Sequence, residues 1–390
     1  MKVPSPEQIL EALEKHTNVL LYGPPGTGKT YLMQEVAKLF SQKYGGVGVR
    51  DAVAIDTEDE ANPLTTMVES TAKVGWVTFH QSYSYEDFVI GLRPDTATEK
   101  LISLVPVPGL LIQLAAFARQ PDFSALLVID EINRGNVSRI FGEFITLLEP
   151  DKRLLKDGEV GERTVQVTLP YLRPAQAVLV DVGGKEVPIV REFTLPRSLY
   201  TLASMNSVDK SVAPLDTALR RRFHIVELPA DEESLAELWG VAAPASEIDL
   251  PDPLADVNDV RRLALQVVYK LNEGIRAFLG SEYCLGQWYL TPLTQDDLSL
   301  ESALKVLSDL WQSSFYPQLE ELFQGRVEQL IAILGLGEDN ASPGPLTVGR
   351  AFADEGGHPY IERRFTTELA LIGFLRQIGG VLPSQPLAGA

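Results

Sequence analysis

The sequence has little that would place it outside a reducing compartment or in a membrane. Its single cysteine, Cys284, cannot form an internal disulfide, which is typical of a protein from a reducing cytosol. No apolar run approaches the ~20 residues that a membrane-spanning helix needs. The N-terminal stretch Met1–Pro6 has no apolar core of a secretory signal. We therefore predict a cytoplasmic protein with no membrane partner.

Basic residues and histidines are also scarce. The chain has 34 basic and 53 acidic residues, so its net charge is −19. A domain that binds DNA through its phosphates usually carries an excess of basic residues. We therefore expect DNA contacts to be indirect or made through partner chains. The four histidines are scattered without ligand spacing, which argues against a zinc site.

What the sequence does have is a sizeable apolar fraction arranged in alternating strands and helices. With 390 residues, 45% of them hydrophobic, we expect two or three domains. Alternation of this kind indicates a parallel sheet covered by helices on both faces. Expected strands are Asn18–Tyr22, Gly75–Phe79, Ala125–Ile129, Leu199–Ala203 and Phe223–Val226, and expected helices are Pro6–His16, Thr30–Gln42, Leu110–Arg119 and Val137–Leu148.

The pattern changes twice after this. Between Thr164 and Phe193 short alternating strands and a Gly183-Gly184 turn indicate an inserted hairpin, and from Asp231 onward helical patterns dominate. We predict an α/β core over residues 1–230 with the hairpin at about 164–195, a helical lid over 231–335 and a tail over 336–390. The lid holds helical patterns at Leu263–Phe278 and Leu298–Leu334 and a linker at Asp249–Pro253, and the tail holds one helix at Thr366–Gln377.

A glycine-rich loop follows the first expected strand. Its residues are Gly23, Pro24, Pro25, Gly26, Thr27, Gly28, Lys29 and Thr30, which fit the P-loop pattern G-x-x-x-x-G-K-[ST] with a strand before it and a helix after it. Backbone N–H groups of such a loop surround phosphates, and the helix N-terminus adds its positive dipole end. Lys29 is expected to reach the β- and γ-phosphates, and the Thr30 hydroxyl to bind Mg²⁺.

Two acids end the strand that begins at Ala125. Asp130 is expected at the carboxyl edge of the sheet, where it would bind Mg²⁺, and Glu131 is expected to polarise the attacking water. Acids that merely cap the next helix are the alternative. Beside a P-loop, we predict a site for nucleoside triphosphate hydrolysis.

Polar groups from two further segments are candidates for the same chemistry. Asn206 ends a strand and is placed to hold the attacking water or the γ-phosphate, although it is also an ordinary turn residue. Arg220, Arg221 and Arg222 precede the last strand, and three adjacent arginines usually form a solvated basic edge. If one reaches a neighbouring subunit's γ-phosphate it is an arginine finger; we favour Arg221, with Arg222 second.

These motifs together resemble an AAA+ ATPase module, and four strings resemble the McrB family in particular. The strings are Thr78–Phe88 (TFHQSYSYEDF), Asp130–Asn136 (DEINRGN), Met205–Ser211 (MNSVDKS) and Ala218–Phe223 (ALRRRF). Family members usually read Asn-Thr-Ala-Asp-Arg-Ser in the third string, so Asn206 and Asp209 fit while Ser207, Val208 and Lys210 depart. The resemblance runs from about residue 18 to about residue 335. Alternating aromatics such as Tyr83, Tyr85 and Phe88 are more often packing residues than a base-stacking platform.

The resemblance implies a hexameric ring with nucleotide sites at subunit junctions, usually GTP as substrate, and a McrC-like partner nuclease. A P-loop contacts only phosphates, so GTP and ATP both stay open. Leu285–Tyr289 (LGQWY) matches the family's lid string Ile-Gly-His-Ser-Tyr loosely, and Trp311–Glu321 resembles its final lid helix. Family members commonly carry a DNA-reading domain before the P-loop. Only about 22 residues precede Gly23, so we expect target recognition to come from another chain, from the tail after Gly335, or not to occur at all.

Two other functions compete with a motor of a restriction complex. One is a MoxR-like ATPase that remodels a protein client, which the strings Glu86-Asp87-Phe88 and Asn133-Arg134 disfavour. The other is an assembly scaffold that binds nucleotide without turnover, which the presence of Glu131 and Arg221 disfavours.

Overall fold

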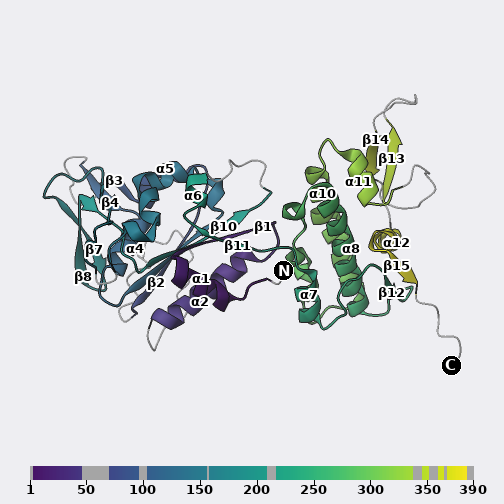
Figure 1. The fold of residues 1–390 in the computed structure, drawn as a ribbon. Coiled ribbons are helices and arrows are strands. Elements are labelled where there is room, and N and C mark those ends of the chain that lie inside the picture. The colour runs from purple at the N-terminus through teal and green to yellow at the C-terminus, as the bar shows by residue number, and fades with distance from the viewer. Residues whose placement is uncertain are drawn as a thin grey trace. The chain divides into compact units, whose positions relative to one another are not determined.

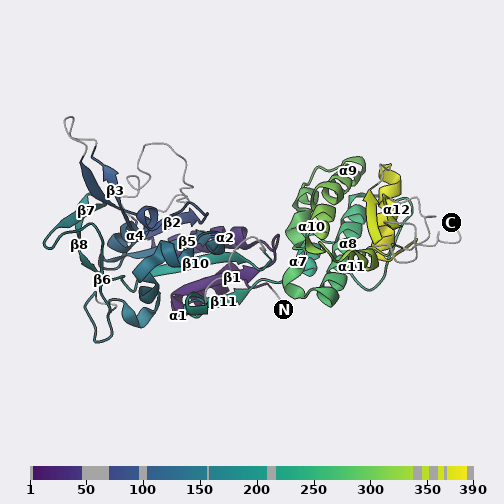
Figure 2. The ribbon, with the colours of Figure 1, turned by 90° about the horizontal axis from the view of Figure 1, so that it is seen from above.

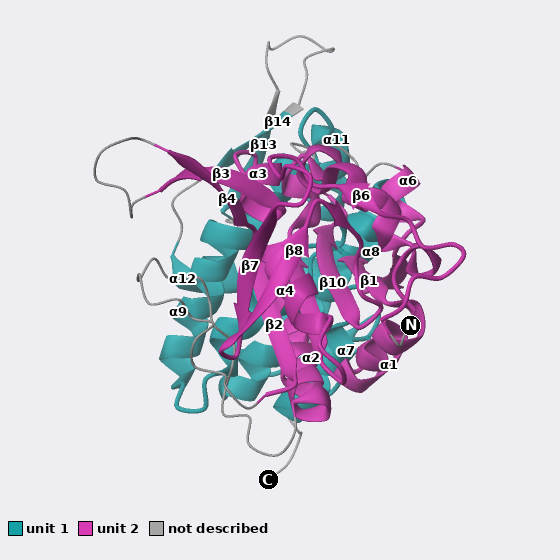
Figure 3. Ribbon diagram, turned by 90° about the vertical axis from the view of Figure 1, so that its left-hand side faces the viewer, with its two compact units in different colours: residues 1–3, 23–28, 229–390 teal, residues 4–22, 29–228 magenta. Residues whose placement is uncertain are grey.

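The chain forms two compact units, shown in different colours in Figure 3. This computed structural model describes residues 3–45, 70–95, 103–155, 158–208, 217–336, 345–350, 359–363 and 367–383. Residues 4–22 and 29–228 form one unit, here called the sheet unit. Residues 1–3, 23–28 and 229–390 form the other, here called the helical unit. In the described ranges, no helix is both long and apolar enough to span a membrane.

A five-stranded sheet in the order β11-β1-β10-β5-β2 organises the sheet unit. Its strands are β1 (Asn18–Gly23), β2 (Ala72–Thr78), β5 (Ser124–Asp130), β10 (Leu199–Asn206) and β11 (His224–Glu227). The pairs β1–β11, β10–β5 and β2–β5 are parallel. The side chains from Ala125 to Ile129 are fully buried, as expected of a strand covered on both faces.

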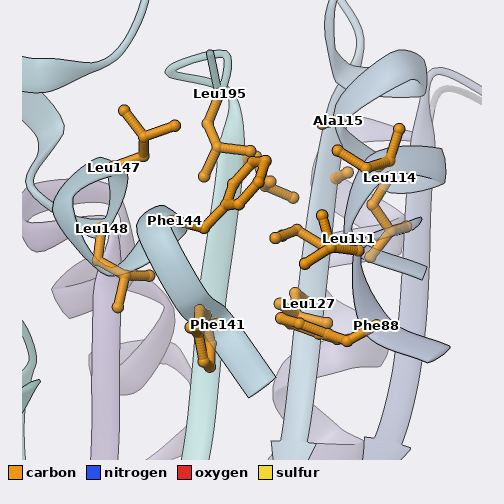
Figure 4. Close-up of a cluster of buried hydrophobic side chains, with 14 of the residues drawn as sticks. Phe88, Leu111, Leu114, Ala115, Leu127, Phe141, Phe144, Leu147, Leu148 and Leu195 are labelled. Atoms are coloured by element: carbon orange, nitrogen blue, oxygen red, sulfur yellow. The ribbon is translucent and has the colours of Figure 1, made fainter. Parts of the chain in front are cut away.

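Helices cover both faces of this sheet. Figure 1 shows α1 (Pro6–His16) and α2 (Lys29–Tyr44) on one face, with α4 (Leu110–Ala118) and α5 (Val137–Phe141) on the other. Figure 4 shows the core under α4 and α5, where Phe88, Leu111, Leu127, Phe141 and Phe144 meet. The predicted parallel sheet flanked by helices is confirmed.

Hairpins extend the sheet unit at one end (Figure 2). Within the segment from residue 164 to 193, β7 (Ala177–Val182) pairs with β8 (Lys185–Val190) across Gly183 and Gly184, and β6 (Val167–Thr168) pairs with β9 (Glu192–Phe193). A further hairpin, which the sequence did not reveal, joins β3 (Ile90–Pro94) and β4 (Leu104–Pro108), next to the short helix α3 (Tyr85–Phe88).

The helical unit is built around one long amphipathic helix, α8 (Val257–Phe278). Asp256 caps its N-terminus by accepting from the Asp259 backbone N–H at 2.9 Å. The other helices of this unit are α7 (Glu232–Trp239), α9 (Leu300–Leu310), α10 (Tyr316–Leu322), α11 (Val327–Ile333) and α12 (Glu368–Gly379). The predicted helical region after the sheet is confirmed.

The structure corrects three predicted elements. The helix predicted over Val137–Leu148 breaks at Gly142, where φ is +51° and α5 gives way to the 3₁₀ turn η2 (Gly142–Leu148). The helical pattern predicted over Leu298–Leu334 is divided among α9, α10 and α11, with a π-helical turn at Trp311–Phe315 and a turn at Gly325.

The third correction concerns strands that the helical pattern concealed. The predicted linker at Asp249–Pro253 contains part of β12 (Ile248–Leu250), which pairs in parallel with β15 (Val381–Pro383). The tail also holds β13 (Leu346–Arg350) paired with β14 (Pro359–Arg363). Strands of three to five residues are too short to show a clear alternation in sequence.

Candidate active site

The loop from Gly23 to Thr30 joins β1 directly to α2. Gly26 and Gly28 have φ values of +77° and +88°, a left-handed backbone that glycine adopts without steric cost. The hydroxyl of the buried Thr27 donates to the carbonyl of Pro24 at 2.9 Å and closes the turn. The glycines of the motif are thus required by the path of the backbone.

Residues 23–28 pack within the helical unit, against Gly286–Tyr289. The backbone N–H groups of Gly286 and Trp288 donate to the carbonyls of Pro25 and Gly26, at 3.2 and 3.0 Å. A Cβ added to Gly26 would lie 2.7 Å from the ring of Tyr289, so the close approach also demands glycine there. The loosely matching string Leu285–Tyr289 therefore lies on the glycine-rich loop.

Lys29 and Thr30 open helix α2 in the sheet unit. Lys29 is only 7% exposed, and burial lowers the pKa of its ammonium to about 8, against the opposing effect of Glu131 and Asp130. The Thr30 hydroxyl lies 3.4 Å from Asp130 Oδ2. The structure thus brings the lysine and threonine of the loop to the acids that end β5.

Asp130 and Glu131 are held by residues of the neighbouring strand β10. The Ser204 hydroxyl donates to Asp130 Oδ1 and accepts from the Glu131 backbone N–H at 3.0 Å. The Asn206 side-chain N–H donates to Glu131 Oε1. Asn206 therefore contacts the carboxylate of Glu131, the residue expected to polarise the attacking water.

Glu131 has two marks of a functional residue. Its backbone is left-handed (φ +53°, ψ +50°), a conformation that costs a non-glycine residue about 1–3 kcal/mol and is found mostly at functional sites. Burial raises the pKa of its carboxyl, although Arg134, whose Nε lies 3.3 Å from Glu131 Oε2, acts in the opposite direction. The strain fixes the direction of the carboxylate.

The oxygens at this edge fit a Mg²⁺ ion. Thr30 and Asp130 present a hydroxyl and a carboxylate, which are ligand types that Mg²⁺ prefers. The buried Asn133 Oδ1 has no hydrogen-bond partner among the described residues, so one more oxygen close in sequence to the acids is unsatisfied.

The three adjacent arginines have three different environments. Arg220 lies over the ring of Tyr22, 5.3 Å from its centroid. Arg222 has only 9% of its side chain exposed and pairs with Glu149 at 2.8 Å. Arg221 has 67% of its side chain exposed and approaches Glu149 only to 3.9 Å. Of the two candidate fingers, only Arg221 presents its guanidinium to solvent.

The backbone of Arg221 and Arg222 lies at the amino end of the parallel strands, opposite the carboxyl end where the acids lie, whereas the side chain of Arg220 reaches Tyr22. They precede β11, whose register pairs Val19 with His224 and Tyr22 with Glu227. The loop leaves β1 at the other end, at Gly23, so the two edges are separated by most of a strand. At ~3.3 Å per residue, the five residue-to-residue steps from Asn18 to Gly23 span about 16 Å.

Sequence reasoning missed the roles of Ser204 and Arg134. Ser204 precedes Asn206 by two residues on the same strand, so its side chain lies on the same face, a periodicity that could have revealed it. Arg134 follows Glu131 by three residues on the turn η1 (Ile132–Arg134), within reach of its carboxylate. The motif residues Asp209, Lys210 and Ser211 lie outside the described residues.

The aromatic string packs into the core. Phe79 and Phe88 are fully buried, their rings meet edge-to-face at 5.7 Å, and Phe141 contacts Phe88 at 4.9 Å. Tyr83 stacks on Phe79 at 5.4 Å. The packing interpretation is therefore the correct one for these side chains.

Comparisons with known proteins point in the same direction as the site. A family model described as the AAA domain of the dynein-related subfamily matches residues 61–223. The type IV methyl-directed restriction enzyme EcoKMcrB subunit of Escherichia coli K12 is 29% identical over 321 residues, which are 81% of this chain and 56% of that protein. The type II restriction enzyme BsuMI component YdiS of Bacillus subtilis 168 is 29% identical over 236 residues, 54% of this chain and 57% of that protein.

The chain therefore spans little more than half the length of the curated relatives it matches. The match to the Escherichia coli subunit nevertheless covers 81% of this chain, and the observed fold agrees with the matched AAA domain. The protein is an AAA+ nucleoside triphosphatase by fold and is related to McrB-type restriction subunits.

Proposed function

We propose that this chain is a Mg²⁺-dependent GTPase or ATPase that assembles into a ring, most simply a hexamer, and serves as the motor of a McrBC-like restriction complex. In this proposal a McrC-like nuclease is the partner that it activates, and DNA is contacted indirectly or through partner chains. Support comes from the two curated relatives, both named as components of restriction enzymes.

One observation carries the enzymatic part of the proposal. Lys29, Thr30, Asp130, Glu131 and Asn206 come together at the carboxyl ends of three neighbouring strands. Phosphoryl transfer needs little beyond positioning and charge stabilisation, and this cluster supplies both.

Each residue then has a distinct task. Lys29 pairs with the β- and γ-phosphates, and Glu131, held by Asn206, orients and polarises the attacking water. Thr30 and Asp130 would hold Mg²⁺, which would neutralise phosphate charge when bound.

The γ-phosphate site is completed by a second chain. Arg221 lies at the amino edge of the sheet, and about 16 Å of strand separates that edge from the loop. Because this distance exceeds the length of one side chain, we infer that Arg221 serves the nucleotide of a neighbouring chain rather than the one bound by its own loop. Its exposure fits a finger for a neighbouring subunit.

The enzymatic proposal is tested by measuring Mg²⁺-dependent hydrolysis of GTP and of ATP by three chains. Wild type is expected to hydrolyse at least one of them. Lys29→Ala should lose nucleotide binding and assembly, because the charge pairing to the phosphates is gone. Glu131→Gln should bind nucleotide and assemble but turn over at least ~10²-fold more slowly, the typical contribution of a positioned acid–base group.

Lys38→Ala and Glu186→Gln are matched controls. Lys38 is exposed on the same helix as Lys29, and Glu186 is exposed on the hairpin strand β8. Both variants should behave as wild type. Near-normal turnover by Lys29→Ala or Glu131→Gln would remove the catalytic assignment, and the ratio of kcat/KM for the two nucleotides identifies the preferred base.

A further inference from the structure

The guanidinium of Arg153 is buried beside the first residues of β1 and β10. Arg153 is 1% exposed, and its N–H groups donate to the carbonyls of Leu147 and Leu199, both at 2.5 Å, and to Asn18 Oδ1 at 3.0 Å. None of the ion pairs in the described part of the chain involves Arg153. A buried charge without a counter-charge is costly, so the hydrogen bonds to these carbonyls are what stabilise the guanidinium in the interior.

Asn18 connects this guanidinium to the arginines that precede β11. Its side chain is fully buried, and its two N–H groups donate to the carbonyls of Leu148, at 2.6 Å, and of Arg222, at 3.2 Å. With its oxygen accepting from Arg153, both donors and the acceptor of the amide are in use. Asn18 thereby fixes the backbone at Arg222 relative to the first residue of β1.

Glu149 contacts both Arg221 and Arg222. Its Oε1 accepts from the largely buried Arg222 at 2.8 Å and lies 3.9 Å from Nη2 of the exposed Arg221. Arg222 also donates to the carbonyl of Ala218 at 2.5 Å, which keeps its side chain folded back onto the preceding helical turn, α6 (Thr217–Arg220). One carboxylate is therefore bound tightly to one arginine and loosely to the next.

Arg221 has room to move away from this carboxylate. Glu149, Arg221 and Arg222 line one hollow of about 390 Å³. Within it the contact of Arg221 with Glu149 is long and solvent-exposed, so it is weak and readily exchanged for a stronger anion. A phosphate bearing more than one charge would win that competition.

We propose that Glu149 is a positioning residue for Arg221, which it holds toward the subunit junction until the γ-phosphate of the neighbouring chain replaces it. Arg222 anchors Glu149, and Asn18 with Arg153 fixes the backbone that carries both arginines. This inference rests on the proposed function of Arg221 as a finger for a neighbouring subunit.

The test is Glu149→Gln, which keeps the shape and removes the charge. A positioning residue affects the chemical step of the junction it serves, so kcat should fall about tenfold, less than the ~10²-fold that a misplaced catalytic group costs. KM for the nucleotide should stay within about twofold of the wild-type value, because the nucleotide is bound at the carboxyl ends of the strands and not at the arginines. Glu149→Asp, which restores a carboxylate, should recover part of the loss.

Mixing separates this role from a structural one. Glu131→Gln chains keep both Glu149 and Arg221. Mixing them with Glu149→Gln chains should therefore give more activity than the sum of the two variants measured separately. Mixing Glu149→Gln with Arg221→Ala chains should restore none. Asp151→Asn, which neutralises an exposed acid two residues away that pairs with Lys152 and Arg163, is the matched control and should keep full kcat.

Three results would overturn the inference. The first is an unchanged kcat in Glu149→Gln, and the second is a loss of kcat in Asp151→Asn equal to that in Glu149→Gln. The third is that Glu131→Gln chains restore the activity of Arg221→Ala on mixing but do not restore that of Glu149→Gln. The last result would contradict the positioning role of Glu149 and leave the role of Arg221 as a finger for the neighbouring chain unaffected. Full activity of Arg221→Ala would contradict both roles.

Discussion

At the scale of single residues, one position of the site, Glu131, has a strained backbone. Glu131 adopts a left-handed conformation while its N–H donates to Ser204 and its carboxylate accepts from Asn206. An L-residue in this region is disfavoured by about 1–2 kcal/mol, whereas glycine is not. The contacts of Glu131 therefore hold a direction that its backbone alone would not choose.

This strain can be measured with a pair of variants that both lack the carboxylate. Glu131→Gly and Glu131→Ala should be equally inactive, but the glycine variant should have a free energy of unfolding higher by roughly 1 kcal/mol, because only alanine keeps the left-handed penalty. Denaturant unfolding of the two proteins side by side gives the difference. An alanine variant as stable as the glycine variant would show that position 131 is not strained.

At the scale of elements, Gly142 decides where a helix ends. Its φ of +51° stops α5 and turns the chain into η2, and a Cβ there would lie 2.9 Å from the ring of Tyr85. The apolar periodicity of Val137–Leu148 continues through this point, so periodicity alone predicted one helix. The break allows Phe141 and Phe144 to enter the same core.

Gly142→Ala should therefore destabilise the chain, even though alanine is the better helix former. We expect a loss of about 1–2 kcal/mol from the left-handed backbone alone, increased by the crowding against Tyr85. Gly240→Ala, at φ +62° with open space around the Cβ, carries the backbone penalty without the crowding and serves as the control. Thermal unfolding of both variants compares them, and a Gly142→Ala protein that unfolds no earlier than Gly240→Ala would refute the packing argument.

At the scale of the whole molecule, the sequence predicted what has a strong local pattern. The P-loop, the acids after β5 and the alternation of strands and helices follow from glycine placement and from apolar runs, and all lie where they were expected. Short strands such as β12 and β3 were missed, because three to five residues carry little periodicity and their pairing is non-local. The distinction between Arg221 and Arg222 also needed the structure, because it depends on Glu149, more than 70 residues away in sequence.

The central claim is that two chains together form each complete site, with Glu131 from one and Arg221 from the other. It is tested most directly by mixing Arg221→Ala and Glu131→Gln chains over a range of ratios at fixed total concentration, with assembly followed by mass. Each variant alone should be nearly inactive, since an arginine finger contributes about 10³–10⁵ in rate. Mixtures should regain turnover with a maximum near equal amounts, because some junctions then combine the two intact residues. An assembled Arg221→Ala protein with near-normal turnover, or mixed rings that stay inactive at every ratio, would contradict the account.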